Sequence, residues 1–211
     1  MTSISVLDAA VRGEAFVEPL TTEQYHRMIE SGVLLEGAPI ELIDGIPVRK
    51  DRRDSAKDSI MTVGPGHRGA VQRVILQLMR LIGDSEQHVW GQQPVHIPPH
   101  HEPEPDVSVV RGKVESYDDH HPGPGDLILV VEVADSSLSY DRGTKLKVYA
   151  AAGIPQYWIV NLNERCVEVH TEPDAEAASY QTRHVFEPGQ TVAFDVAGQT
   201  LELDVNSILP S

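Results

Sequence analysis

The segment that decides the fold is residues 124–162, PGDLILVVEVADSSLSYDRGTKLKVYAAAGIPQYWIVNL. Residues 127–134 form an apolar, strand-like run, and residues 139–153 have the composition of a helix that stops at Gly153. Residues 156–162 are strand-like again. A buried strand, a helix and a second buried strand in succession predict an α/β core. Four alternating segments between residues 166 and 205 predict that the chain finishes as β-structure.

One carboxylate interrupts the first apolar run. Glu132 has apolar neighbours on both phases of the alternation, so the strand should be buried on both faces. A buried carboxylate is costly unless it is paired, protonated or bound to a metal. Asp106, at the start of the preceding strand, could share a divalent cation with Glu132, whereas Lys145 in the following helix could form an internal ion pair with it. The residues alone leave both alternatives open.

The remainder of the chain predicts one domain that follows a short arm. Residues 1–18 read as a flexible N-terminal arm, and residues 19–211 as a single domain. A helix framed by a Thr cap and Gly32 precedes a hairpin centred on Asp44 and Gly45. An amphipathic helix over residues 67–82 and strands over residues 88–97 and 106–110 lead into the central segment.

Composition narrows the class of protein. The chain has 211 residues, without a continuous apolar run long enough to span a membrane and without a signal peptide at its start. The single cysteine, Cys166, excludes an internal disulfide, is predicted to be a packed thiol and fits a reducing cytoplasm. We therefore expect a cytoplasmic protein that does not associate with membranes. A homodimer is compatible with the sequence but is not indicated by it.

The net charge of −15 argues against bulk attraction to nucleic acid, because the overall field repels polyanions. Binding of nucleic acid would therefore need a metal ion or a local basic patch. The basic residues that could supply such a patch are 49–53 (RKDRR), Arg68, Arg73, Arg80, Arg142, Lys145 and Lys147. For any single one of them, a solvated surface position is the simpler interpretation.

Several motifs in a fixed order resemble the bacterial Uma-two family. They are IELIDG (40–45), EPDVSVV (104–110), DLILVVEV followed by DSS (126–137), and AAGIPQYWIV (151–160), together with Asp141, Lys145 and Tyr149 at four-residue spacing. That family comprises restriction-endonuclease-like proteins of the PD-(D/E)xK nuclease superfamily. The resemblance covers residues 21–170 and implies a restriction-endonuclease-like α/β fold, a central mixed β-sheet flanked by helices, with extra C-terminal antiparallel strands. It also implies a Mg²⁺-dependent or Mn²⁺-dependent endonuclease that acts on nucleic acid, with DNA as the expected substrate.

By this resemblance Asp106 and Glu132 match the two metal-binding carboxylates of the superfamily. Lysine usually stands two residues after the second carboxylate, but this chain has Ala134 there. Lys145 on the following helix matches the position to which the lysine has moved. Asp141, Lys145 and Tyr149 would form one stripe of that helix, whereas Lys147 should point about 200° away. A surface ion pair between Asp141 and Lys145 is the alternative.

Two further positions match the family, and two histidine pairs do not. Glu41 aligns with an acidic residue that is often placed near the metal, although an exposed hairpin glutamate is an equal alternative. His67, at the start of the amphipathic helix, is expected to support the site, whereas Tyr149 is expected to hold the helix in place. The pairs at 100–101 and 120–121 lack the spacing of a zinc site and are predicted to face solvent.

Two other functions remain open from the sequence. The fold could serve as a non-catalytic binding module, for which the acidic charge favours a protein partner over DNA. It could also belong to a metal-dependent hydrolase of a smaller phosphoester, which needs no long basic groove. Convergence of Asp106, Glu132 and Lys145 would favour an enzyme, and the shape and charge of the adjoining surface would indicate the size of its substrate.

Overall fold

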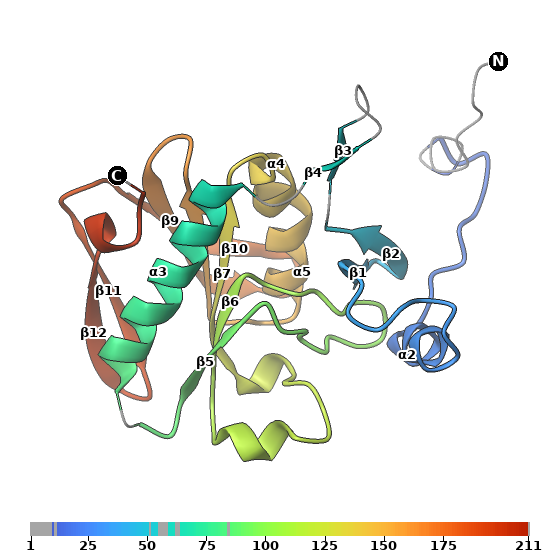
Figure 1. The fold of residues 1–211 in the computed structure, drawn as a ribbon, viewed down its shortest axis with the longest axis horizontal. Helices are drawn as coiled ribbons and strands as arrows, with labels where there is room; N and C mark the ends of the chain where they lie inside the picture. The colour runs from blue at the N-terminus through green and yellow to red at the C-terminus, as the bar shows by residue number, and fades with distance from the viewer. Residues whose placement is uncertain are drawn as a thin grey trace.

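The architecture is a six-stranded mixed sheet covered on both faces (Figure 1). The computed structural model describes residues 10, 12–50, 52–54, 59–61, 64–83 and 85–210. The strands lie in the order β10-β9-β8-β7-β6-β5. Their bounds are β5 (His88–Gly91), β6 (Val107–Val110), β7 (Leu127–Ala134), β8 (Gln156–Asn161), β9 (Cys166–Asp174) and β10 (Ser179–Phe186). The mixed α/β sheet expected from the sequence is thereby confirmed.

Strands β7 and β8 form the parallel pair of this sheet, and the other neighbouring strands pair antiparallel. A parallel pair needs a crossover connection, which the predicted helix supplies. The helix is continuous but not uniform: α4 (Leu138–Tyr140) and α5 (Leu146–Ala151) flank one π-helical turn, Asp141–Lys145. Gly153 follows with a φ of 72°, a conformation that glycine adopts without strain. The helix stop was therefore predicted correctly, but the π-turn was not.

Each face of the sheet is covered by a different layer. Helix α3 (Pro65–Ile82) and the hairpin of β11 (Thr191–Val196) and β12 (Gln199–Asp204) cover one face, as Figure 1 shows. The core there includes Leu78, Val131, Trp158, Phe194 and Leu203. Helices α4 and α5 cover the other face, where Val130, Tyr149, Tyr157 and Ile159 are buried. Strand β7 is therefore buried on both faces, as its apolar run predicts.

The N-terminal part lies beyond the α5 side of the sheet (Figure 1). It comprises α2 (Thr22–Glu30), the hairpin of β1 (Ile40–Ile43) and β2 (Ile46–Arg49), and the hairpin of β3 (Arg52–Asp54) and β4 (Ser59–Met61). Gly45 in the first turn has a φ of 70°, and a Cβ there would lie 2.5 Å from Pro19. Glycine is therefore required in this turn. Single 3-10 turns occur at Val114–Tyr117, Pro124–Asp126 and Val205–Ser207.

Two predictions about the long connections need correction. The strand expected over residues 88–97 ends at Gly91, because Gln92 has a positive φ and prolines at 94, 98 and 99 cannot donate to a ladder. The connection packs against β1 instead, where Glu102 and Leu42 exchange backbone hydrogen bonds. His100 and His101 are partly buried there and hydrogen-bonded to Leu20 and Asp44, so they do not face solvent as expected.

The N-terminal arm remains a prediction, since residues 1–9 and 11 lie outside the described residues. Leu20 is already tied to the body by a backbone hydrogen bond to Gly45. Cys166 is buried, in accord with the predicted packed thiol. In the part of the chain that the structure describes, no helix combines the length and the apolar character needed to span a membrane.

Candidate active site

The register between β6 and β7 places the two predicted metal ligands side by side. Val107 pairs with Val131 and Ser108 with Val130 in this antiparallel ladder. The same register, continued by one position, sets Asp106 directly opposite Glu132. Side chains that are opposite each other on one face of an antiparallel pair are close neighbours. The preference of the sequence for two buried strands is therefore what brings these carboxylates together.

Asp106 is held in place from two sides. Its Oδ2 accepts a hydrogen bond of 2.9 Å from the backbone N–H of Val133 and lies 3.1 Å from Nε2 of His67 at the start of α3. Burial would raise the pKa of Asp106, but His67 and the Val133 N–H lower it below its usual range. Burial likewise works against the charged form of His67, and the contact with Asp106 outweighs it, so the pKa of His67 is raised. His67 therefore contacts Asp106, and its supporting role at the site stays a prediction.

Glu132 is a buried carboxylate with two donors. Its side chain is 7% exposed, and its Oε1 accepts hydrogen bonds from Lys145 Nζ at 3.0 Å and from the Tyr149 hydroxyl at 2.8 Å. Burial raises the pKa of Glu132 to about 7, against the lowering effect of Lys145, and the charges of Asp106 and other nearby carboxylates add to the rise. The ion pair with Lys145 therefore compensates this carboxylate only in part.

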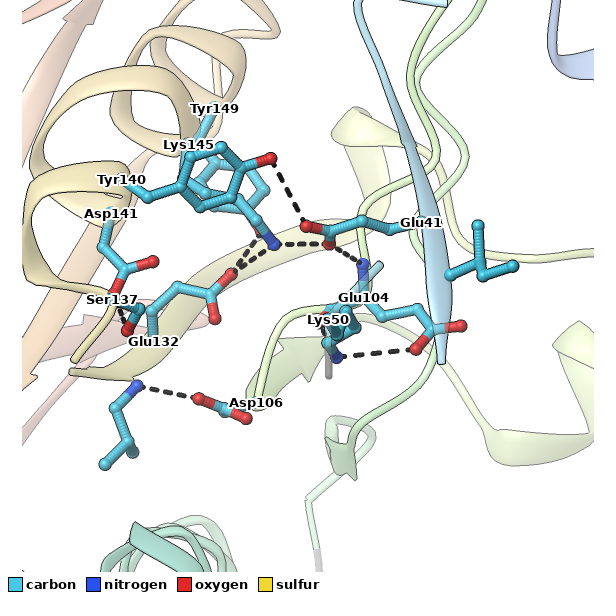
Figure 2. A network of polar contacts seen from close by, with 12 residues as sticks. Glu41, Lys50, Glu104, Asp106, Glu132, Ser137, Tyr140, Asp141, Lys145 and Tyr149 are labelled. Atoms are coloured by element: carbon cyan, nitrogen blue, oxygen red, sulfur yellow. Dashed lines mark hydrogen bonds and ion pairs between the residues drawn. The ribbon is translucent and has the colours of Figure 1, made fainter. Parts of the chain in front are cut away.

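Lys145 lies between two carboxylates (Figure 2). Its ammonium group donates to Glu41 Oε2 at 2.6 Å as well as to Glu132, and its side chain is 3% exposed. Burial would lower the pKa of Lys145, but the charges of Glu132 and Glu41 outweigh it and raise that pKa. Lys147 is exposed. The predicted orientation of the two lysines is thus confirmed, and Lys145 is a cation at neutral pH.

Glu41 reaches the same cluster from β1. It is buried, which excludes the alternative of an exposed hairpin glutamate. Besides Lys145, it accepts the backbone N–H of Glu104 at 3.2 Å, and the Tyr140 hydroxyl lies 3.5 Å from its other oxygen. A residue 104 positions before Lys145 therefore shares this lysine with Glu132, as Figure 2 shows.

Asp141 is hydrogen-bonded to Ser137 and not to Lys145, and its supporting role stays a prediction. Its carboxylate accepts a hydrogen bond of 2.6 Å from the Ser137 hydroxyl, and no ion pair joins it to Lys145 within the described residues. Burial raises the pKa of Asp141 to about 6, although Ser137 and Lys145 act to lower it. The surface ion pair considered for Asp141 and Lys145 is excluded, since both residues are buried. The π-turn that begins at Asp141 changes the helix geometry assumed from the spacing.

Sequence reasoning missed several members of this network. Tyr140 and Glu104 contact Glu41, and Lys50, directly after β2, donates to the backbone carbonyl of Glu104 at 2.7 Å. The acidic residue just before Pro105 and Asp106 was a visible signal for Glu104. The contact between Tyr140 and β1 had no sequence signal, because it joins segments about a hundred residues apart.

The donor set of the site fits a hard divalent cation. Asp106 Oδ1 and Glu132 Oε2 accept no hydrogen bond from any of the described residues. Each carboxylate therefore has one oxygen that can bind another partner. Two buried carboxylates, Glu41 and Glu132, contact the buried Lys145, and Asp106 is a third buried carboxylate that makes no ion pair with this lysine among the described residues. Mg²⁺ prefers carboxylate oxygens and keeps several waters, so two protein ligands suffice for it.

Glu41 does not complete a compact three-carboxylate cluster. Within the described residues, groups of three potential ligand atoms within 4.8 Å of one another occur elsewhere and do not include Glu41, Asp106 and Glu132 together. The ammonium group of Lys145 occupies the position between Glu41 and Glu132. A role for Glu41 as a metal ligand therefore stays a prediction, whereas its contact with Lys145 is established.

An open cleft of about 1510 Å³ adjoins the cluster along Lys50 and Glu104. Among the described residues that line it, carboxylates outnumber lysine and arginine by seven to two. Arg142, one of the residues considered as part of a basic patch, is paired with Glu164 and Glu168. The field in this cleft consequently favours cations over polyanions.

Comparison with known proteins supports the fold. A family model named Uma2 and described as "Putative restriction endonuclease" matches residues 22–206. The crystal structure of a "putative nuclease belonging to DUF820" from Anabaena variabilis aligns with a TM-score of 0.62 and 17% sequence identity. That alignment covers 90% of this chain and 97% of the other. At this identity the likeness shows a shared fold. No curated protein matches the chain.

Proposed function

The chain belongs to the Uma2 family, and on that premise we propose that it is a metal-dependent endonuclease that hydrolyses phosphodiester bonds of DNA. The observation that carries this proposal is the convergence of Asp106, Glu132 and Lys145. Asp106 immediately precedes β6, which pairs with the strand β7 that carries Glu132, and Lys145 donates to Glu132 at 3.0 Å. Paired carboxylates with a neighbouring cation suit chemistry on a phosphate group.

In this proposal Asp106 and Glu132 hold one Mg²⁺ or Mn²⁺ through the oxygens that accept no hydrogen bond from the described residues. When bound, such an ion lowers the pKa of a coordinated water and neutralises charge on the phosphate. His67 and the Val133 N–H keep Asp106 ionised, since both lower its pKa. Ligand carboxylates must be ionised, so this support favours metal binding.

The role of Lys145 follows from its charge. Its pKa is raised, so it stays protonated at neutral pH and cannot accept a proton as a general base. It can donate hydrogen bonds to the attacking water or to a phosphate oxygen, where negative charge develops in the transition state. Glu41 and Tyr149 act as positioning residues in this proposal, because each contacts Lys145 or Glu132 and holds the pair in place.

A cleavage assay on tag-free protein tests the proposal. Supercoiled plasmid, linear duplex, single-stranded DNA and RNA are each incubated with Mg²⁺, Mn²⁺ or a chelator. We expect nicking and linearisation of plasmid with Mg²⁺ or Mn²⁺, loss of cleavage with chelator, and loss in Asp106→Asn. Lys147→Ala is the matched control, since Lys147 is exposed and two residues from Lys145. Cleavage that persists in Asp106→Asn would refute the assignment.

The acidic cleft favours a second candidate, a metal-dependent hydrolase of a smaller phosphoester. The seven carboxylates and two basic side chains that line the cleft would repel a long polyanion. A compact phosphoester bound to a metal ion would be repelled less, because the metal neutralises part of its charge. The discriminating substrate is bis(p-nitrophenyl) phosphate. Cleavage of this diester by the wild type, without cleavage of any nucleic acid, and with loss in Asp106→Asn, would select the second candidate.

A further inference from the structure

Two histidines and a glutamate converge at a point away from the Asp106–Glu132 pair. His26 lies on α2, whereas His96 and Glu102 lie in the long connection between β5 and β6. Nε2 of His26 is 2.8 Å from Oε1 and 2.7 Å from Oε2 of Glu102, and Nδ1 of His96 is 3.1 Å from Oε2. The three potential ligand atoms all lie within 4.8 Å of one another.

Glu102 has an unusual environment for a carboxylate. Its side chain is only 4% exposed, yet within the described residues its ion-pair partners are these two histidines, with no lysine or arginine. A buried carboxylate normally requires a compensating charge. The described partners of this buried carboxylate thus include no permanently charged group, and a bound cation would complete its environment.

We propose that His26, His96 and Glu102 form a second metal site, selective for a transition metal of the Zn²⁺ class and independent of the Asp106–Glu132 site. Two imidazole nitrogens with one carboxylate suit Zn²⁺, Co²⁺ or Ni²⁺ and not Mg²⁺, which prefers oxygen ligands throughout. Tetrahedral ligands at about 2.0–2.2 Å from zinc lie roughly 3.3 Å apart, so the distances from Glu102 to His26 and to His96 need to open by only a few tenths of an ångström. The nitrogens of the two histidines lie within 4.8 Å of each other.

The surroundings supply further ligand positions. All three residues line the acidic cleft, so the remaining coordination positions are accessible to water. His121 lines the same cleft, and its ring centroid is 6.4 Å from that of His26. A third imidazole therefore lies beside the three proposed ligands.

A metal in this site would link α2 to the connection between β5 and β6, which is itself hydrogen-bonded to β1. Glu102 exchanges two backbone hydrogen bonds with Leu42 on β1, the strand that carries Glu41. His26 belongs to α2, which otherwise contacts this region through Thr22 N–H and the Pro99 carbonyl and through the Tyr25 hydroxyl and the Ile40 carbonyl. Metal binding at residues from α2 and from the connection should therefore stabilise the folded state by mass action.

Metal binding to tag-free protein tests this proposal. The protein is stripped with a chelator, dialysed and titrated with Co²⁺, whose visible absorption reports nitrogen and oxygen coordination, and separately with Zn²⁺ by calorimetry. We expect one high-affinity site in the wild type and a rise in melting temperature with Zn²⁺. His26→Gln and His96→Gln should each lower the Zn²⁺ affinity by more than about tenfold, because even residues that only orient metal ligands change metal affinity by ~10–100-fold.

Two controls separate this site from the proposed nuclease site. His184→Gln changes an exposed histidine on β10 and should bind Zn²⁺ like the wild type. The double variant Asp106→Asn, Glu132→Gln should also retain the site, whatever its effect on cleavage. The proposal is overturned if the wild type takes up no Zn²⁺ or Co²⁺, or if both histidine variants bind as the wild type does. Both variants replace side chains that are more than a third exposed, so each should fold.

Discussion

Replacement of Glu132 by glutamine in the metal-free protein should change the pH dependence of stability in a defined direction. Burial raises the pKa of Glu132 to about 7 from its ordinary value of 4.5. Between these two values the folded state holds a proton that the unfolded state has released. The contribution of Glu132 to stability is therefore lost as the pH rises toward 7 and above. Glutamine cannot titrate, so the variant should lack this loss.

The size of the effect follows from the same two pKa values. One pKa unit corresponds to about 1.4 kcal/mol, so the wild type should lose about 2 to 3 kcal/mol from Glu132 between pH 5 and pH 8. The glutamine variant should gain that amount relative to the wild type over the same interval. Glutamine makes weaker hydrogen bonds with Lys145 and Tyr149, which lowers the free energy of unfolding of the variant equally at pH 5 and at pH 8. This effect therefore cancels when the two pH values are compared.

Urea denaturation with a chelator at pH 5 and at pH 8, for the wild type and Glu132→Gln, measures this difference. Glu168→Gln is a contrasting variant, because His170, Arg142 and Arg183 hold the pKa of that buried carboxylate well below its usual range despite burial. Its glutamine variant should therefore lose stability at both pH values. If Glu132→Gln instead becomes less stable relative to the wild type at pH 8, Lys145 fully compensates Glu132, and the pair is a structural ion pair.

Other changes have equally definite expectations. Lys145→Ala should lower the initial rate of metal-dependent cleavage on the order of a hundredfold and leave the metal affinity unchanged. Lys147→Ala should weaken substrate binding only slightly, and this loss should become smaller at high salt. A large loss of cleavage in Lys147→Ala with little loss in Lys145→Ala would contradict the observed helix orientation. Tyr149→Phe removes a donor to Glu132 and should destabilise the protein by about 2 kcal/mol in urea denaturation. Mg²⁺ affinity, measured by calorimetry, should fall about tenfold for each pH unit below 7 as protons compete for Glu132, and a flat profile would contradict Glu132 as a ligand.

The core of the site could be predicted because burial made its residues conspicuous. Glu132 stands out in an apolar strand, Asp106 begins the neighbouring strand, and the helix phase separates Lys145 from Lys147. Each of these inferences depends on local periodicity, which the fold preserves. Glu41 required the family resemblance, since its contact with Lys145 joins segments 104 residues apart.

What could not be predicted depends on tertiary contacts without a local signal. The π-turn at Asp141–Lys145 leaves no mark in the hydrophobic pattern, and the connection after Gly91 looked like strand until prolines and backbone geometry decided otherwise. His26, His96 and Glu102 are scattered over 77 residues with no metal-binding spacing, and only the packing of α2 against the connection brings them together.

The central claim is that Asp106 and Glu132 together hold a divalent cation. Anomalous diffraction from a crystal grown with Mn²⁺ measures this most directly, because it locates the ion without relying on activity. We predict a manganese peak within coordination distance of carboxylate oxygens from both residues, with the peak absent in Asp106→Asn, Glu132→Gln. A well-ordered wild-type crystal with saturating Mn²⁺ and no peak between these two side chains would contradict the account.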